Sequence, residues 1–233
     1  MDYLFYQPEL LHGADTLSTE EAIHCVKVLR KKAGELITLT DGAGSFYTAR
    51  LISASPSGCR FKVIDQTTFQ KPKPDITIAV SPVKHADRFE WMIEKCTEAG
   101  AGTFIPVLCT RTQKSNIRID RLKKISISAL KQSLRPWLPE IREPMQFDEL
   151  LNQFPNSARL ICTAEGMPPI QWIKETNTAT HVVFVIGPEG DFTIEELQRA
   201  RHAGFLSVNL GPNRLRTETA AVAATTIAAA FSA

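Results

Sequence analysis

Residues 181–221 read HVVFVIGPEGDFTIEELQRARHAGFLSVNLGPNRLRTETAA. The run at 181–186 is apolar on both faces, which is typical of a central strand in a covered parallel sheet. A helix is predicted over 193–203, because Thr193 can cap it and acidic residues occupy its first turn. A second strand at 205–210 and a terminal helix rich in alanine follow. This alternation of strands and helices predicts an α/β domain.

The same alternation extends back to about residue 75. Strands are predicted over 76–83, 104–109 and 159–163, and helices over 89–99 and 120–134. Upstream, residues 1–70 contain short runs with partial alternation, separated by glycines, which predict β-hairpins. Prolines and lysines at 69–75 form a stiff connector, where we place the domain boundary. The predicted fold class is therefore α/β with a mostly parallel sheet, preceded by a small β domain.

The composition is that of an ordinary globular protein, with 43% hydrophobic and 22% charged residues. The first residues lack the basic and apolar regions of a secretory signal. The terminal alanine run is shorter and less apolar than the roughly 20 residues that a bilayer requires, so a membrane anchor is not expected. Five cysteines without a C-x-x-C pair indicate reduced, buried thiols and hence a cytoplasmic protein.

Basic residues are concentrated in two segments. Residues 110–142 hold nine basic and two acidic residues, and residues 22–34 hold four basic residues and no acidic one. Because the formal net charge of the whole chain is only +2, the rest of the chain is acidic. Two basic surfaces favour a polyanionic partner such as nucleic acid. On charge alone, solvated helix faces explain the pattern equally well.

Two glycine-proline loops follow the last two predicted strands, IGPEGD at 186–191 and LGPN at 210–213. Ligands gather beyond the carboxyl ends of strands in open α/β sheets, and glycine allows close backbone approach there. Either loop alone is more simply an ordinary turn, but two at successive strand ends favour one shared pocket. The chain has no P-loop, dinucleotide, metalloprotease or serine hydrolase motif, and its histidines lack metal-ligand spacing. No metal site is expected.

The segment RLRTET at 214–219 stands at the start of the alanine helix. Of three interpretations, a helix cap, a membrane anchor and one wall of a ligand site, the length of the alanine run already excludes the anchor. Thr217 is predicted as the N-cap of the alanine helix, with Glu218 in its first turn. Capping does not account for Arg214 and Arg216, whose charges oppose the helix dipole unless they face an anion. The uncharged helix is predicted to be buried, against the sheet or a partner subunit.

GPEGDFT, followed by LGPNRLRTETAA, resembles the C-terminal signature of the SPOUT superfamily of methyltransferases. The greatest similarity is to the RsmE family, which methylates N3 of one uridine in bacterial 16S ribosomal RNA (rRNA). The resemblance spans the chain: HCVKVLR at 24–30 is similar to the family's PUA-like domain, and ALKQSLR at 129–135 is similar to one of its helices. The family more often has glycine at the position of Asp191, and an arginine where this chain has Asn213.

The resemblance implies a PUA-like RNA-binding β-barrel over 1–70 and a SPOUT methyltransferase domain with a deep C-terminal trefoil knot over 75–233. It also implies a homodimer, in which the alanine helix is suited to the contact. The implied cofactor is S-adenosyl-L-methionine, bound among three knotted loops. The residues that the resemblance assigns to this cofactor are Thr163, Ile186, Gly187, Pro188, Glu189, Gly190, Leu210, Gly211, Leu215, Arg216, Thr217, Thr219 and Ala220.

Methylation of uracil N3 requires that its proton leaves and that charge on O2 or O4 is stabilised. Arg216 is the candidate for the electrostatic role, and Glu189 or Glu218 for accepting the proton; capping explains Glu218 equally well. The expected partner is 16S rRNA of the small ribosomal subunit, at an unstacked or single-stranded site. Charge and the resemblance together give the candidate RNA-binding residues Lys27, Arg30, Arg111, Lys114, Arg118 and Arg135.

Two other functions stay open on the sequence. The first alternative is a SPOUT enzyme with the same fold that methylates the ribose 2′-oxygen of tRNA instead of uridine N3. The second is an RNA-binding assembly factor with the same fold and no catalytic activity. The methylated position separates the first alternative from uridine N3 methylation, and cofactor binding separates the second.

Overall fold

The computed structural model describes residues 3–113 and 116–231. Contacts divide the chain into two units: Met1–Lys71 with Ile127–Leu138 form the first, and Pro72–Ser126 with Pro139–Ala233 form the second. The helix α3, Ile119–Ser133, begins in the second unit and ends in the first. The return of residues 127–138 to the first unit has no counterpart in the sequence patterns, and the boundary predicted at 69–75 stays a prediction.

The first unit contains a four-stranded sheet in the order β1-β2-β3-β4. These strands are β1 Leu4–Tyr6, β2 Leu36–Thr40, β3 Ser45–Ser55 and β4 Gly58–Thr68. The antiparallel pairs β2–β3 and β3–β4 are the predicted hairpins, while β1 joins β2 in parallel. Short helices complete the unit: the 3-10 helix η1 Pro8–His12, α1 Thr19–Ile23 and the π-helix η2 His24–Val28. Ser18 caps α1, because its side-chain oxygen accepts a hydrogen bond from the Glu21 amide.

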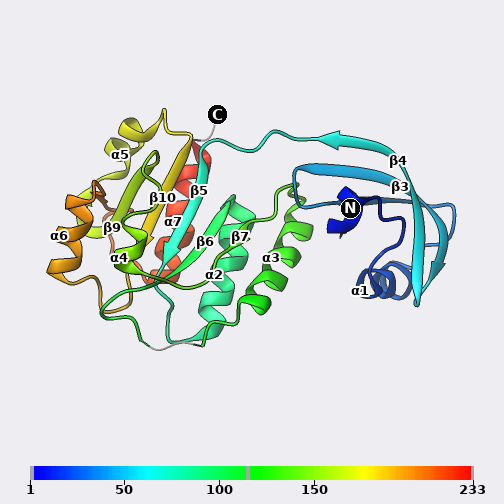
Figure 1. Ribbon diagram of the computed structural model, residues 1–233, viewed down its shortest axis with the longest axis horizontal. Coiled ribbons are helices and arrows are strands. Elements are labelled where there is room, and N and C mark those ends of the chain that lie inside the picture. Colours follow the sequence, from blue (N-terminus) through cyan, green and yellow to red (C-terminus); the bar gives the residue numbers. More distant parts are fainter. Residues whose placement is uncertain (1–2, 114–115, 232–233) are drawn as a thin grey trace. The chain divides into compact units, whose positions relative to one another are not determined.

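The second unit is built on a seven-stranded sheet in the order β11-β9-β10-β5-β6-β7, with β8 paired to β6. Every pairing in it is parallel, which confirms the predicted sheet type. Figure 1 shows most of these strands. They are β5 Asp75–Val80, β6 Thr103–Leu108, β7 Glu140–Ile141, β8 Met145–Gln146, β9 Ala158–Met167, β10 His181–Ile186 and β11 Leu206–Val208. The trefoil knot stays a prediction of the resemblance.

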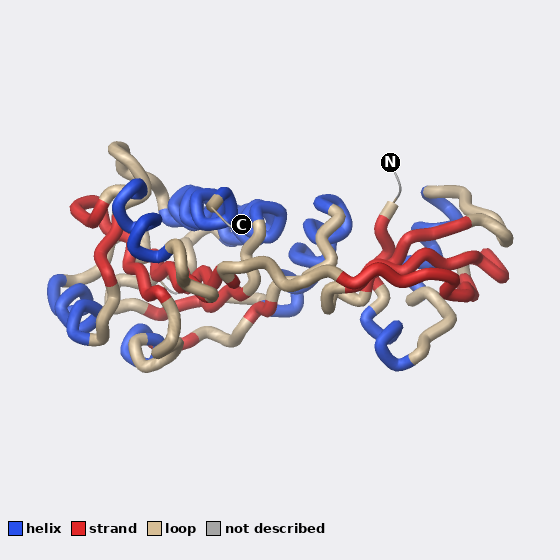
Figure 2. The backbone as a smooth tube through the Cα atoms, turned by 90° about the horizontal axis from the view of Figure 1, so that it is seen from above, coloured by secondary structure: helices blue, strands red, loops and turns tan. Residues whose placement is uncertain are grey.

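Helices cover both faces of the parallel sheet (Figure 2). On β10, Val182, Phe184 and Ile186 pack into one core, and Val183 and Val185 into a second. The first core takes its helical residues from α2, α3, α5 and α7, and the second from α4 and α6. Their bounds are α2 Ala86–Ala99, α4 Phe147–Leu150, α5 Pro169–Thr176, α6 Ile194–His202 and α7 Thr217–Ala230. This two-sided burial explains why the β10 sequence is apolar throughout.

The two strands nearest the sheet edge differ in length from their predictions. The strand predicted at 159–163 extends through Met167 as β9, and the strand predicted at 205–210 is reduced to the three residues of β11. The reason is an irregularity in their pairing: the register shifts between Ser207 and Val208, so that Val208 faces Met167. Local sequence patterns do not indicate such a bulge.

The alanine helix α7 is buried, as its lack of charge predicts. It packs along α2 and across β5 and β10. Ala221, Ala224 and Thr225 are fully enclosed, and their small side chains permit this close approach. Among the helices of the described residues, α7 included, none has the length and hydropathy needed to cross a membrane.

We predict that Gly166→Ala lowers the free energy of unfolding by about 1–3 kcal/mol, the usual cost of an overpacked site. A methyl group at Gly166 would overlap the backbone of Val208 on the neighbouring strand, which a side-chain rotation cannot relieve. Denaturant unfolding measures the loss. Gly190→Ala is the control in the same unit, because its methyl group meets Arg111 at an ordinary 3.5 Å. Equal stability of both variants would contradict the prediction.

Candidate active site

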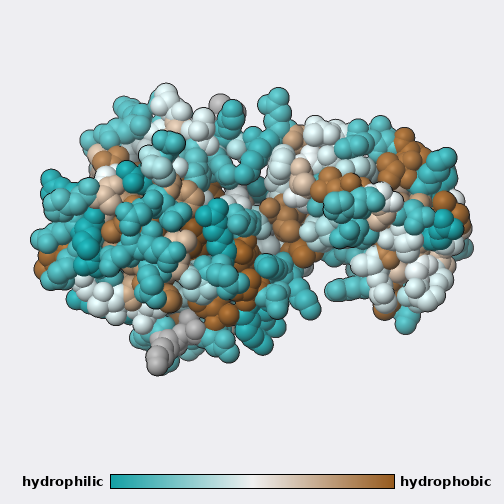
Figure 3. Space-filling model, viewed as in Figure 1, coloured by the Kyte–Doolittle hydropathy of each residue, from teal (hydrophilic) through white to brown (hydrophobic). Residues whose placement is uncertain are grey.

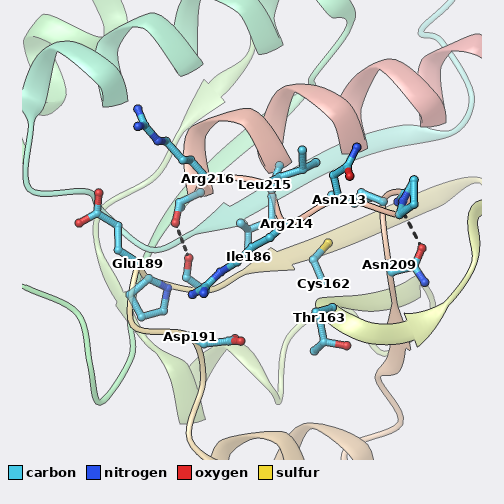
Figure 4. Close-up of a pocket in the computed structure, with 18 residues that line it drawn as sticks. Cys162, Thr163, Ile186, Glu189, Asp191, Asn209, Asn213, Arg214, Leu215 and Arg216 are labelled. Atoms are coloured by element: carbon cyan, nitrogen blue, oxygen red, sulfur yellow. Dashed lines mark hydrogen bonds between the residues drawn. The ribbon is translucent and has the colours of Figure 1, made fainter.

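Both glycine-proline loops border one cavity of about 460 Å³ at the carboxyl edge of the parallel sheet (Figure 4). One loop follows β10, the other follows β11, and β9 adds a third wall. Among the residues predicted to bind the cofactor, Gly190 and Thr219 do not line this cavity, and all the others do. The lining residues are Cys162, Thr163, Ala164, Ile186, Gly187, Pro188, Glu189, Asp191, Asn209, Leu210, Gly211, Pro212, Asn213, Arg214, Leu215, Arg216, Thr217 and Ala220.

A hydrogen bond joins the two loops directly. Thr217 Oγ1 donates to the carbonyl oxygen of Gly187 at 3.0 Å, and the Thr217 side chain is buried. The prediction that Thr217 is the N-cap of α7 is therefore wrong. The N-cap position belongs to Arg216, which makes no side-chain capping bond, and Thr217 is the first helical residue. The Thr217 hydroxyl instead holds the first loop against the start of α7, because it reaches the carbonyl of Gly187, the residue directly after β10.

The second loop is fastened by Asn209, which sequence analysis did not single out. Its Nδ2 donates to the carbonyl of Gly166 at 2.7 Å, and its Oδ1 accepts from the Gly211 amide at 3.2 Å. The buried Trp172 donates from Nε1 to the Asn209 carbonyl at 3.2 Å. An asparagine two residues before a glycine is a known turn-forming arrangement, and this was the signal available in the sequence.

The first loop is braced from the side by Arg111. Its Nη1 donates to the carbonyl oxygens of Gly190 at 2.8 Å and Phe192 at 3.4 Å. Asp191 has a φ of 61°, in the left-handed region, where the glycine that the resemblance leads us to expect would be free of strain. The Asp191 carboxylate accepts from the Phe192 amide at 2.8 Å. Aspartate tolerates this conformation better than most residues because of such local bonds.

Charged side chains gather at one end of the cavity, where Figure 4 shows Arg216 and Glu189 together. Arg88, on the first turns of α2, lies between two carboxylates: its Nη1 is 3.5 Å from Glu189 Oε1 and 4.0 Å from Glu218 Oε1. Arg216 is exposed and has no carboxylate within ion-pair distance among the described residues. The free guanidinium of Arg216 is thus available to an incoming anion or carbonyl oxygen.

The two candidate proton acceptors differ in access. The Glu189 side chain is 40% exposed and lines the cavity. The Glu218 side chain is only 7% exposed, does not line the cavity, and its Oε2 is buried without a hydrogen-bond partner. A group bound in the cavity therefore reaches the carboxylate of Glu189 and not that of Glu218.

The cavity wall also includes a thiol. Burial raises the pKa of Cys162 to about 12, so this thiol stays protonated at physiological pH. Because the thiolate is the nucleophilic form of cysteine, Cys162 is not suited to form a covalent intermediate. The site therefore favours direct transfer between two bound ligands.

None of the candidate RNA-binding residues that the structure describes lines the cavity. Lys27, Arg30 and Arg118 are exposed, while Arg135 is half-buried and burial lowers the pKa of its guanidinium. Lys114 lies outside the described residues. In the described part of the chain, no group of three or more His, Cys, Asp or Glu side chains could hold a metal ion.

Two family models match this chain: an RNA methyltransferase domain over residues 70–229 and an RNA methyltransferase PUA domain over residues 17–64. A Synechocystis protein named ribosomal RNA small subunit methyltransferase E is 30% identical over 218 residues, covering 91% of this chain and 71% of the relative. This chain belongs to the ribosomal RNA small subunit methyltransferase E family. The resemblance inferred from the two loops is confirmed.

Solved structures extend the family match to the whole fold. A probable rRNA methyltransferase from Porphyromonas gingivalis has a TM-score of 0.88 and 37% identity, covering 96% of this chain and 95% of its own. A ribosomal RNA small subunit methyltransferase E from Neisseria gonorrhoeae, bound to S-adenosyl methionine, has a TM-score of 0.85 and 32% identity, covering 97% and 95%. The predicted α/β class with an N-terminal PUA-like domain is confirmed for this family member.

We predict that Thr217→Val lowers the free energy of unfolding by about 0.5–1.5 kcal/mol, the usual net value of one hydrogen bond. The substitution keeps the shape of the side chain and removes the donor to Gly187. Denaturant unfolding gives the measurement, and Thr217→Ser, which keeps the hydroxyl, is the matched control. A valine variant as stable as the serine variant would show that the bond contributes nothing.

Proposed function

We propose that this protein transfers the methyl group of S-adenosyl-L-methionine to N3 of one uridine in 16S rRNA of the small ribosomal subunit. One observation carries the proposal: both glycine-proline loops enclose one cavity, with Arg216 and Glu189 at one end. Relatives that cover most of the chain share the small-subunit rRNA methyltransferase name. Related structures from Neisseria gonorrhoeae and Legionella pneumophila are described as holding this cofactor.

The chemistry of the cavity fits S-adenosyl-L-methionine, which joins a flat adenine to a sulfonium and an amino-acid end. Ile186, Leu210 and Leu215 provide apolar wall, and the main chain of both loops provides hydrogen-bonding groups. Gly211 has a φ of 138°, and a Cβ there would meet no atom within 4 Å, so space beside its backbone is open to a ligand. When bound, the cofactor supplies an electrophilic methyl group.

The residues at the charged end act on the uracil. Glu189 accepts the proton from N3, because its carboxylate is exposed to the cavity. Arg216 stabilises the negative charge that develops on O2 or O4, as fixed donors do in other transfer reactions. Glu218 is enclosed and pairs with Arg88, so its role is to hold that arginine beside Glu189.

The assembly and location of the protein are part of the same proposal. In the single chain, Thr219 and Thr226 on α7 are exposed and Val222 and Ala223 are half-buried, which leaves a stripe of small uncharged side chains for a second copy. This supports a homodimer, with the second glycine-proline loop, which leads into α7, beside the contact. A small-subunit rRNA substrate places the enzyme in the cytoplasm.

The decisive experiment incubates the protein with small ribosomal subunits that lack the modification and with S-adenosyl-L-methionine. Mass spectrometry of the digested rRNA is expected to show N3-methyluridine at one position. A ribose 2′-O-methyl group would instead support the other SPOUT chemistry. Calorimetry with S-adenosyl-L-methionine tests the second alternative, a non-catalytic assembly factor. Absence of cofactor binding would support that alternative.

We predict that Arg216→Ala lowers the rate of methylation by about 100-fold or more, as loss of an electrostatic stabiliser does elsewhere. The fold is expected to be unchanged, because Arg216 is exposed and makes no capping bond. Single-turnover assays on small subunits measure the rate. Arg201→Ala removes an exposed arginine from α6 and is the control. Near-normal turnover of the Arg216 variant would mean that another group stabilises the charge.

We predict that reversing the charge of Lys27 and Arg30 to glutamate weakens RNA binding and lowers the salt dependence of binding. Each lost phosphate contact on a single strand reduces the slope of log K against log salt by about 0.7. Both side chains are exposed and belong to the first unit, and neither lines the cavity, so cofactor affinity is expected to stay unchanged. Filter binding at several salt concentrations tests the first part and calorimetry the second. An unaltered salt slope would remove these residues from the RNA-binding surface.

A further inference from the structure

A second pocket, of about 290 Å³, lies in the second unit beside the start of α2. We refer to it as the α2 pocket. We propose that it binds one nucleotide of the substrate RNA strand next to the target uridine, with the base inside and its phosphate at the rim. This inference rests on the proposed function. The described residues that line it are Pro82, Val83, Lys84, Ala86, Phe89, Glu90, Asn116, Ile117, Arg118 and Leu122.

The α2 pocket is next to the cavity of the active site. Its residues Pro82–Lys84 follow β5, and β5 pairs in parallel with β10, whose end carries the first glycine-proline loop. The loops after these strands therefore leave the sheet at the same edge, and the Ser81 amide donates to the Ile186 carbonyl at 2.9 Å. Arg88, one residue before Phe89 of the pocket, contacts Glu189 of the cavity at 3.5 Å. The α2 pocket is thus within reach of a nucleotide next to one whose base enters the cavity.

The interior of the α2 pocket suits a nucleobase. Val83, Phe89 and Leu122 are buried and form an apolar floor. The surface seen in Figure 3 is mostly hydrophilic, with scattered hydrophobic patches. RNA-binding proteins commonly place unstacked bases against aromatic side chains such as Phe89. One polar group at the pocket, the Asn116 side-chain amide, offers hydrogen bonds to the edge of a base.

Charge at the rim selects an anionic strand. Lys84 and Arg118 are exposed, and neither has an ion-pair partner among the described residues. The acidic Glu90 is neutralised by Arg121, which donates to both of its carboxylate oxygens. The rim is therefore net positive around an apolar interior, which is the combination that single-stranded nucleic acid requires. A peptide or a lipid headgroup alone does not account for both features.

Ala86→Trp tests the α2 pocket, because Ala86 is exposed on the first turn of α2 and an indole there fills the space. We expect the KM for small subunits to rise about 10-fold or more, the effect of losing one stacked base. Cofactor affinity and kcat should change little, since the cavity is untouched. Gln198→Trp adds an exposed tryptophan on α6 and is the matched control.

A double variant keeps the test valid if the tryptophan variant fails to fold. Lys84→Gln with Arg118→Gln removes the rim charges without changing any buried group, and should weaken binding of a single-stranded RNA fragment carrying the target uridine by about 5-fold or more. Unchanged KM and RNA affinity in a folded variant would overturn the α2 pocket as a subsite. Failure of the unaltered protein to methylate small subunits would instead overturn the proposed function.

Discussion

The parallel register of β9, β10 and β5 is the constraint on which the candidate site depends. Because these strands run in the same direction, the loops that follow them leave the sheet at one edge. The hydrogen bond from Thr217 to Gly187 then fixes the start of α7 against the first loop. One bond of this kind is worth little to overall stability, but it sets the separation of the two cavity walls.

The composition of α7 follows from the same geometry. Its first residues border the cavity, so the rest of the helix has to lie close to β5, β10 and α2. Only small side chains permit that approach, and Ala221 and Ala224 are fully enclosed by it. The absence of charge after Thr219 reflects this packing, and the two arginines that precede the helix, Arg214 and Arg216, line the cavity.

The sequence predicts the parallel sheet and the two loops, because each is encoded within a short segment, and the family resemblance supplies most of the residues that line the cavity. It does not predict the partners of Thr217, Asn209 or Arg88, which lie on segments distant in the chain. The capping assignment of Thr217 failed for this reason: local preference favours a cap, and a tertiary contact uses the hydroxyl instead. The choice between Glu189 and Glu218 likewise depends on burial, which two neighbouring sequence motifs do not reveal.

Much of the cavity surface is main chain, supplied by glycine and proline residues in the two loops. An alanine scan removes side-chain atoms and leaves peptide groups in place, so such a scan would report few sensitive positions along these loops. Loss of affinity would appear mainly where a substitution alters backbone direction, as at Gly211 with its positive φ. A loop residue whose alanine variant binds normally can therefore still contact the ligand through its main chain.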